Sequence, residues 1–241
     1  MRDYKAETEQ RVSWIRETLE DSGARGIIFG NSGGKDSALV GILCRQATEN
    51  VLGVMMPCGT KVNYSTDIEH AKLLADAFAI KNTVVELTPG KDALLQELGR
   101  AAEITPAAAA NINPRLRMAT LYTFGQSLGY IVAGTGNASE RHIGYFTKWG
   151  DGAFDFNPIA DLTATEVLDF LQHLGAPAEI TNKPPSAGLY EGQTDETDIG
   201  LTYAALDKFI QTGEGQPADI EKINRMHKQS MHKRQPPKIY H

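Results

Sequence analysis

The chain has 241 residues, 41% of them hydrophobic and 22% charged, and a net charge of −6 at pH 7. This length suits one globular domain over residues 1–241 that buries roughly 70% of its unfolded surface. No apolar run approaches the roughly 20 residues that cross a bilayer, and the polar start is unlike a secretion signal, so we expect a cytoplasmic protein without membrane contact. The acidic balance argues against general nucleic-acid binding, which needs a broad basic surface.

The first third of the chain alternates short apolar runs with amphipathic segments. We expect a helix over 6–21, a strand over 27–29, a helix over 36–47, a strand over 51–55, a helix that begins at Ser65 or Asp67, and a strand over 83–87. Such alternation is typical of a parallel sheet covered on both faces. The predicted fold class is therefore α/β, an open, doubly wound, Rossmann-like parallel sheet. Cys44 and Cys58 lack a neighbouring metal ligand, which favours reduced packing residues.

The pattern beyond residue 90 is less regular, and segment 105–110 favours no element. We expect a small helix over 92–98, a helix from Pro114 to Leu128, a strand over 130–133, a loop over 141–157, a helix from the capping box at 163–166 to Leu174, a mobile loop over 183–193 that is a candidate lid, and helices over 198–210 and 217–231. The basic tail over 232–238 is of a kind that is usually disordered. No internal repeat or second-domain boundary is evident.

A glycine-rich turn, Gly30-Asn31-Ser32-Gly33-Gly34-Lys35-Asp36-Ser37, joins the first predicted strand to its helix. Adjacent glycines allow an anion to approach the main chain, and the positive end of the helix favours a phosphate there. Asp36 stands where a Walker P-loop has Ser or Thr, and an acid beside phosphates suggests Mg²⁺ between them. The turn resembles the pyrophosphate loop of ATP pyrophosphatases. A purely structural strand-to-helix turn is the alternative.

A second turn, from Gly134 to Glu140, directly follows the predicted strand over 130–133. In an open parallel sheet, ligands bind beyond the carboxyl ends of the strands. We therefore expect this turn to lie on the same edge of the sheet as the phosphate turn.

Six runs of sequence, in order, resemble the NAD synthetase family of N-type ATP pyrophosphatases, whose fold is of the adenine nucleotide alpha hydrolase type. They are Asn111 to Met118, Gly134 to Glu140, Gly144 to Gly152, Pro185-Ser186-Ala187, Gln193-Thr194-Asp195-Glu196 and His232-Lys233-Arg234-Gln235, and the phosphate turn precedes them. The resemblance covers about residues 25–237. One such motif is weak, but six in register are specific.

The resemblance implies a ligase that makes NAD from ATP, ammonia and deamido-NAD (nicotinic acid adenine dinucleotide). The nicotinate carboxylate attacks the α-phosphorus of ATP to give an adenylate and pyrophosphate. Ammonia then attacks the acyl carbon and displaces AMP. Mg²⁺ would offset the charge that grows on pyrophosphate.

The same resemblance assigns ATP binding to residues 30–37, Thr135 and Ser186, and metal binding to Asp36 and Glu140. Two carboxylates at neighbouring strand ends are suited to share one ion. The alternative for Glu140 is a solvated acid in a loop. Lys35 offers a positive charge at a position where the family often has another polar residue.

Deamido-NAD binding is assigned by resemblance to Arg115, Lys148, Asp155, His232 and Lys233. An arginine can donate two bonds to a phosphate or carboxylate. Lys148 and Asp155 are the expected catalytic residues, Lys148 to neutralise the substrate carboxylate or an oxyanion and Asp155 to attract ammonium or accept its proton. An aromatic side chain of the loop, Tyr145 or Phe146, would either stack on the nicotinate ring or fill the core.

The chain departs from the family pattern at two places. Ala164 stands where the family commonly has a lysine that contacts ATP, so the phosphate grip is weaker or comes from another group such as Lys183 or Lys35. Asn113-Pro114 replaces the usual Lys-Ala before Arg115. These differences affect affinity and leave the reaction class intact.

The resemblance also implies partners. The family is a homodimer whose subunits share the dinucleotide site, and the helix over 114–128 is the candidate interface. This chain has no room for the glutaminase domain of glutamine-dependent relatives, so free ammonia is the expected nitrogen donor. Other ATP pyrophosphatases, of the GMP synthetase or tRNA-thiolating kind, and an ATP sensor without turnover are the alternatives. Thiolation would need a reactive cysteine and a basic RNA surface, and neither is evident.

Overall fold

The computed structural model describes residues 2–59, 65–183, 186 and 194–240. Its centre is a four-stranded sheet in the order β3-β2-β1-β4, and all neighbouring strands pair in parallel. The strands are β1 (Gly26–Gly30), β2 (Val51–Met55), β3 (Lys81–Val84) and β4 (Tyr130–Ala133). Parallel strands need crossover connections, and helices supply them here.

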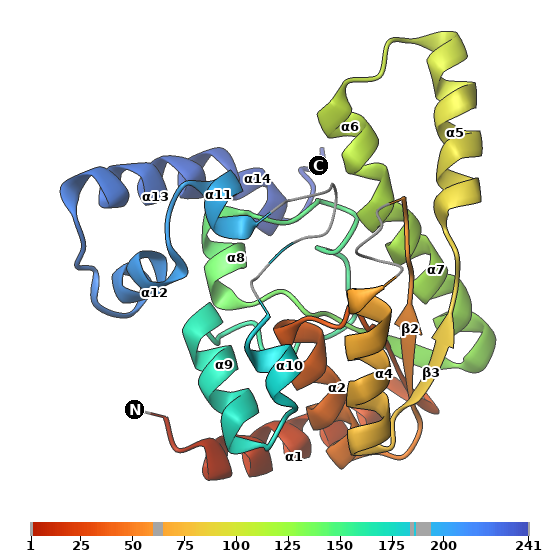
Figure 1. The fold of residues 1–241 in the computed structure, drawn as a ribbon, viewed down its shortest axis with the longest axis vertical. Helices are drawn as coiled ribbons and strands as arrows, with labels where there is room; N and C mark the ends of the chain where they lie inside the picture. Colours follow the sequence, from red (N-terminus) through yellow and green to blue (C-terminus); the bar gives the residue numbers. More distant parts are fainter. Residues whose placement is uncertain (1, 60–64, 184–185, 187–193, 241) are drawn as a thin grey trace.

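Helices cover both faces of the sheet (Figure 1). One face carries α2 (Lys35–Ala47) and α4 (Thr66–Phe78), with α1 (Tyr4–Ser22), α9 (Ala164–His173) and α10 (Ala178–Thr181) outside α2. The other face carries α7 (Ile112–Leu128), which packs on β1 and β4. The predicted open, doubly wound α/β fold is confirmed.

Strand β1 shows why the sheet is buried on both sides. Successive side chains of a strand point to opposite faces. Ile27 and Phe29 belong to the apolar cluster around α2, whereas Ile28 belongs to the cluster under α7. All three are fully buried, so β1 reads as a continuous apolar run.

Two further groups of helices extend from this frame. The first packs around Ile143, Leu206 and Ile223 and contains α8 (Ala138–Ile143), α11 (Asp195–Ile199), α12 (Tyr203–Thr212), α13 (Pro217–Gln229) and α14 (Met231–Arg234). The second consists of α5 (Thr88–Ala101) and α6 (Pro106–Ala110), which stand apart as an arm at the upper right of Figure 1.

Several predicted boundaries were wrong. The third strand is β3 at Lys81–Val84 and not 83–87, although Val85 N–H and Leu87 N–H still donate to β2 and the residues after it. Helix α7 begins before Pro114, because the first turn of a helix has no partner for its N–H groups and tolerates proline. Helix α5 is longer than the expected 92–98 for the same reason, with Pro89 in its first turn.

The predicted loop over 141–157 and the helix over 198–210 also need correction. Residues Ala138–Ile143 form α8, which Asn137 and Glu140 close with a capping box. The region after 194 holds two helices, α11 and α12, separated by Gly200 at φ 65°. The capping box of α9 at Thr163 is confirmed. Most of the candidate lid over 183–193 lies outside the described residues.

Both cysteines are buried and free, as expected of packing residues. Within the described part of the chain, no helix is both long and apolar enough to cross a bilayer.

Candidate active site

The topology brings two distant turns together. Strand order reverses at β1, because β2 and β3 lie on one side of it and β4 on the other. The turns after β1 and β4 therefore meet at the carboxyl edge, where open α/β sheets bind ligands. A cavity of about 520 Å³ opens at this point, and both turns line it.

The phosphate turn adopts the backbone that its glycines predict. Gly33 has φ +68°, and a Cβ there would lie 2.3 Å from the carbonyl oxygen of Asp67, so no other residue fits. Ser37 Oγ lies 3.0 Å from Ser32 Oγ across the turn. Every residue from 30 to 37 except Gly33 lines the cavity.

Asp36 and Glu140 line the same cavity, as a shared ion requires. Asp36 Oδ1 accepts a hydrogen bond from Asn137 Nδ2 at 2.9 Å, and Asp36 Oδ2 lies 2.7 Å from Lys35 Nζ. Glu140 Oε2 accepts from the N–H of Asn137 at 3.1 Å. One asparagine of the second turn therefore fixes both carboxylates across the gap between β1 and β4.

The cluster carries more negative than positive charge. Burial and the nearby carboxylate of Asp36 raise the pKa of Glu140 well above its usual range, although Lys35 opposes this. Burial works against the ammonium of Lys35, but Asp36, Glu140 and Asp195 together raise its pKa. Tyr203 OH donates to Asp195 Oδ2 at 3.0 Å behind Lys35.

This donor set fits Mg²⁺ better than it fits a site made wholly of protein ligands. In the described residues, no group of three or more His, Cys, Asp or Glu side chains is placed to hold a metal. Mg²⁺ is typically held by one or two carboxylates together with substrate phosphates and water. Asp36 and Glu140, beside a phosphate turn, match that pattern.

The residues expected to bind the substrates divide into two groups. Thr135, Ser186 and Lys233 line the cavity together with the phosphate turn. The other four are absent from its lining, and they are Arg115, Lys148, Asp155 and His232. Arg115 and His232 are exposed. A single chain therefore gathers the ATP and metal candidates but separates most of the deamido-NAD candidates from them.

Asp155 is held in the edge of the sheet. Its Oδ2 accepts from the N–H of Val132 at 2.7 Å and its Oδ1 from Tyr122 OH at 3.1 Å. These bonds attach the chain after residue 154 to β4, beside the isolated bridge between Ala133 and Phe156. In this geometry the carboxylate serves the backbone of β4.

Lys233 shows that the basic tail is ordered, against the default expectation for such a segment. Its Nζ donates to the carbonyls of Gly144 and Phe146 at 2.8 and 2.6 Å. Helix α14 can come this close because residue 144 is glycine, where a Cβ would lie 2.1 Å from Ser230 Cβ. Lys148 Nζ donates to the carbonyl of His232 at 2.8 Å, which binds the same loop to the tail.

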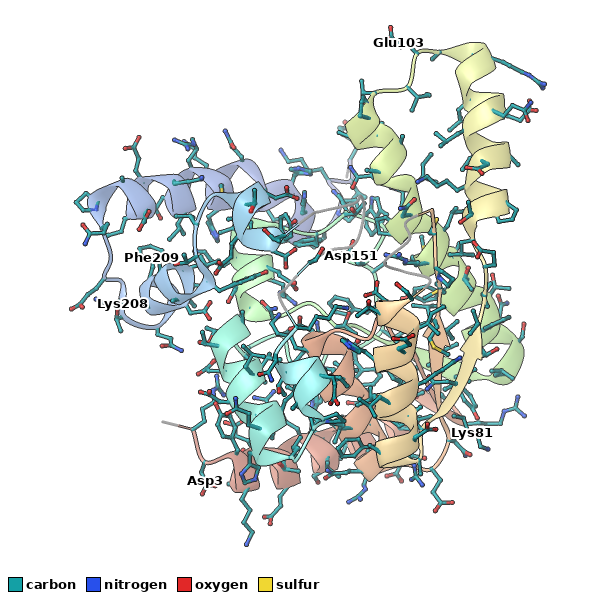
Figure 2. The ribbon with its side chains drawn as sticks, viewed as in Figure 1. Asp3, Lys81, Glu103, Asp151, Lys208 and Phe209 are labelled. Carbon is teal, nitrogen blue, oxygen red and sulfur yellow. The ribbon has the colours of Figure 1, made fainter. Side chains whose placement is uncertain are left out.

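Sequence reasoning missed Asp151 and Arg117 as cavity residues. Asp151 lies near the middle of the molecule in Figure 2 and opens onto the cavity. Desolvation by the surrounding protein raises the pKa of its carboxyl group, although the N–H of Thr147 donates to it at 2.9 Å. Arg117 donates from Nε to the carbonyl of Met56 at 3.2 Å, and burial lowers its pKa. The Gly-Asp-Gly run was the available signal for Asp151.

Ala164, the departure from the family pattern, is buried at the start of α9 in the cluster with Tyr203. Its N–H donates to Ser139 Oγ at 3.0 Å. The ring of Tyr203 also faces Lys35, whose Nζ lies 5.4 Å from the ring centroid. Lys35 therefore supplies a positive charge on this side of the cavity. Lys183 lines the cavity too and pairs with Asp67 at 2.5 Å.

Comparison with known proteins gives a consistent assignment. The family model described as NAD synthase matches residues 7–237. The NH(3)-dependent NAD(+) synthetase of Carboxydothermus hydrogenoformans is 45% identical over 240 residues and the alignment covers 98% of each chain.

Solved structures agree in fold over the whole chain. An NMN synthetase from Francisella tularensis superposes with a TM-score of 0.92 at 31% identity, covering 100% of this chain and 99% of its own. An NH3-dependent NAD synthetase from Campylobacter jejuni gives 0.81 at 28% identity and covers 100% of both chains. A glutamine-dependent NAD+ synthetase from Acinetobacter baumannii, at 23% identity and TM-score 0.67, shares the fold over 99% of this chain but 47% of its own.

The family predicted from the sequence motifs is confirmed by these matches. The chain belongs to the NAD synthase family of ATP-dependent ligases.

Proposed function

We propose that this chain converts deamido-NAD, ammonia and ATP into NAD, AMP and pyrophosphate. The observation that carries the proposal is the single cavity shared by the phosphate turn, Asp36 and Glu140. A nucleoside triphosphate bound there would have its phosphates at the amino end of α2, next to the carboxylates of Asp36 and Glu140. Membership of the NAD synthase family supports deamido-NAD as the second substrate.

The chemistry runs through an adenylated intermediate. A carboxylate oxygen of the pyridine ring forms a bond to the α-phosphorus, and the bond from that phosphorus to the bridging oxygen of pyrophosphate breaks. Ammonia nitrogen then bonds to the acyl carbon, AMP leaves with the carbon–oxygen electron pair, and the nitrogen loses a proton. The first step is an in-line displacement at phosphorus. The second is addition of ammonia to the acyl carbon followed by loss of AMP.

Asp36 and Glu140 would hold Mg²⁺, which supplies charge neutralisation on the phosphates when bound. Asn137 keeps both carboxylates aimed at one place through its side-chain and backbone N–H groups. The N–H groups of the phosphate turn orient the nucleotide. These residues account for positioning and for electrostatic stabilisation.

Asp151 is our candidate for receiving the proton released as ammonia attacks. It lines the cavity, and burial raises the pKa of its carboxyl group, which makes it a stronger proton acceptor than an exposed aspartate. Lys233 also lines the cavity and offers a cation for the substrate carboxylate. Asp155 and Lys148, the catalytic residues predicted from the family resemblance, lie outside this lining, and we assign them to the second subunit's share of the site.

A homodimer gives those residues a role. Leu94 and Leu98 on α5 and Leu128 on α7 are large apolar side chains left exposed, and Arg115 lies on the same α7. Docking of a second copy on α7 would cover this surface and bring Arg115, Lys148, Asp155 and His232 towards the partner's cavity. Light scattering measures the mass of the particle, and a monomer at micromolar concentration would refute the dimer.

A second candidate function differs in the size of the acid that is amidated. The TM-score of 0.92 to the NMN synthetase exceeds the 0.81 to the NAD synthetase of Campylobacter jejuni. The second candidate is therefore amidation of the mononucleotide acid in place of the dinucleotide. Both reactions use the same cavity and differ in how far the substrate extends from it.

Pyrophosphate release tests these proposals. The protein is assayed with ATP, Mg²⁺ and ammonium, and with either deamido-NAD or nicotinic acid mononucleotide. We expect repeated turnover with deamido-NAD only when ammonium is present, because without ammonia the reaction stops after one adenylation. Chelation of Mg²⁺ should abolish pyrophosphate release. A higher kcat/KM for the mononucleotide establishes the second candidate, and release with neither acid refutes both. A cytoplasmic location, with residues 1–241 as one domain, completes the proposal.

A further inference from the structure

Lys35 is a buried lysine whose ammonium group lies among carboxylates. The residue is 5% exposed, and its Nζ lies 2.7 Å from Asp36 Oδ2. The ring of Tyr203 closes the other side, with its centroid 5.4 Å from Nζ. The hydroxyl of that tyrosine reaches Asp195, so aromatic and acidic groups surround the ammonium. A lysine is rarely buried unless it is paired, and here the pairing partner is a proposed metal ligand.

Both oxygens of Asp36 already have partners. Oδ1 accepts from Asn137 Nδ2 at 2.9 Å and Oδ2 from Lys35 Nζ at 2.7 Å. A divalent cation binds carboxylate oxygens directly. Each oxygen has a second lone pair, but a cation bound to Oδ2 would lie within a few ångströms of Nζ. Two cations a few ångströms apart repel each other, and in a partly buried site water screens that repulsion poorly. The ammonium and the metal ion therefore exclude each other from Oδ2.

We propose that the ammonium of Lys35 is the counter-ion of Asp36 in the metal-free protein and competes with the divalent cation for that carboxylate. Once the cation displaces it, the ammonium turns to the nucleotide phosphates. This inference rests on the proposed metal site at Asp36 and Glu140. Lys35 is suited to both positions because it begins α2, directly after Gly34 of the phosphate turn, and lines the cavity itself. Its flexible stem allows the change of partner.

The device couples metal and nucleotide. Before either arrives, the ammonium offsets part of the charge of Asp36, Glu140 and Asp195, whose repulsion would otherwise separate them. When the metal replaces it, the ammonium is released towards the place where phosphate charge enters. Lys35 is thus a positioning residue, and it accounts for the grip that Ala164 does not provide.

Direct binding of Mn²⁺ tests the competition without use of activity. The probe is the electron paramagnetic resonance signal of free Mn²⁺, titrated into nucleotide-free protein. Lys35→Gln removes the competing charge, so we expect Mn²⁺ to bind at least about threefold more tightly than to the unmodified protein. Lys35→Arg retains the charge and is expected to bind Mn²⁺ no more tightly than the unmodified protein.

Lys183→Gln is the matched control. It removes one positive charge from the same cavity, but that charge pairs with Asp67 at 2.5 Å and not with Asp36. Its affinity for Mn²⁺ should stay within about twofold of the unmodified protein, since the removed charge was already neutralised. If Lys183→Gln and Lys35→Gln gained the same affinity for Mn²⁺, the gain would reflect the total charge of the cavity. That result would overturn the competition at Asp36.

The second readout has the opposite sign. With saturating Mg²⁺ and a non-hydrolysable ATP analogue, Lys35→Gln should bind the analogue several-fold more weakly, because the released ammonium is missing. A simple loss of structure would weaken both ligands, so tighter Mn²⁺ with weaker nucleotide identifies the exchange. If Lys35→Gln does not fold by circular dichroism, Lys35→Met replaces it, since an apolar side chain suits a buried position.

Asp36→Asn separates this inference from the proposed function. If the unmodified protein binds Mn²⁺ and Asp36→Asn does not, the metal site stands, and equal or weaker binding by Lys35→Gln then overturns the counter-ion alone. If Asp36→Asn binds Mn²⁺ as well as the unmodified protein does, the metal site itself is wrong, and the counter-ion falls with it.

Discussion

Two charge clusters in this protein use the same residue types to opposite effect. One ties Arg2 and the first half of α1 to α9 and the residues before it. There Arg2 and Arg11 contact Glu7, Asp161 and Glu166 at 2.6 to 3.0 Å. The other is the cavity cluster, where Lys35 lies among Asp36, Glu140 and Asp195. In the first every carboxylate touches a guanidinium. In the second the acids outnumber the ammonium.

The pKa values record the difference. Burial opposes the charge of Asp161 and Glu166, yet both pKa values are lowered. Arg11 and Arg2 lower the pKa of Asp161, and hydrogen bonds from Thr163 and Arg2 lower that of Glu166. Burial and Asp36 raise the pKa of Glu140 instead. Shifts of pKa that favour the uncharged form of a side chain are common at functional sites. Well-paired ions instead stabilise the fold. The comparison therefore assigns stability to the first cluster and ligand binding to the second.

The largest expected effect comes from removing a cavity acid. Asp36→Asn should lower kcat/KM by roughly 10³-fold, as for the loss of one electrostatic contact to a reacting group. The folded state should also lose stability, because the buried ammonium of Lys35 loses its ion pair. Relief of repulsion with Glu140 and a retained acceptor for Asn137 offset part of that loss. Steady-state kinetics and a thermal melt measure the two quantities. Activity within tenfold of the unmodified protein would contradict a metal role for Asp36.

The corresponding experiment on the first cluster removes a cation, that of Arg11. Arg11→Met should cost about 2 kcal/mol of unfolding free energy, because its partners are partly exposed and the guanidinium also donates to the carbonyl of Pro158. Urea denaturation measures the loss. The kcat/KM should stay unchanged, since Arg11 is remote from the cavity lining. A large kinetic defect with normal stability would erase the distinction between the clusters.

Glu140→Gln should change stability in the opposite direction from the matching substitution in the first cluster. Glutamine keeps an oxygen to accept from the N–H of Asn137, and it removes one charge from a crowded group. We expect a gain of about 1 kcal/mol in unfolding free energy at pH 7.5, together with lost activity. In contrast, Glu166→Gln breaks a contact to Arg2 and should destabilise. Two losses of stability would remove the contrast.

The smallest effect concerns pH. A carboxyl group with a lowered pKa stabilises the fold above its unfolded pKa, which is about 4, and this contribution disappears as pH falls through the lower folded value. Asp161 and Glu166 therefore predict a loss of unfolding free energy below about pH 4. In Arg11→Met that loss should be smaller. Urea midpoints collected between pH 3 and pH 7 test it, and parallel curves would mean that Arg11 does not lower the pKa of Asp161.

The sequence predicted the frame because local patterns specify it. An apolar run followed by Gly33 and Gly34 marks a strand end and a phosphate turn, and the turn after β4 follows from the same logic. Asn137 shows where local patterns fail. Its bond to Asp36 joins residues 101 positions apart, and no periodicity encodes such a contact. Asp151 was missed for the same reason, since its environment comes from α7, the loop over 144–152 and α14.

Short elements were the other limit. Helix α8 has six residues, fewer than a periodic pattern needs to be recognised. Its capping box, Asn137 with Glu140, was the usable signal, but both residues were already explained as parts of a ligand-binding turn. The position of the tail at Lys233 depends on carbonyls of a distant loop, so its basic composition alone favoured a disordered segment.

The bond between Asn137 and Asp36 has a consequence for protein synthesis. As the chain leaves the ribosome, the phosphate turn emerges 101 residues ahead of the asparagine that fixes its acid. A growing chain therefore exposes an anion-binding turn before the second strand end is in place. The two acids of the nucleotide site can be fixed only after Asn137 has emerged and β4 has paired with β1.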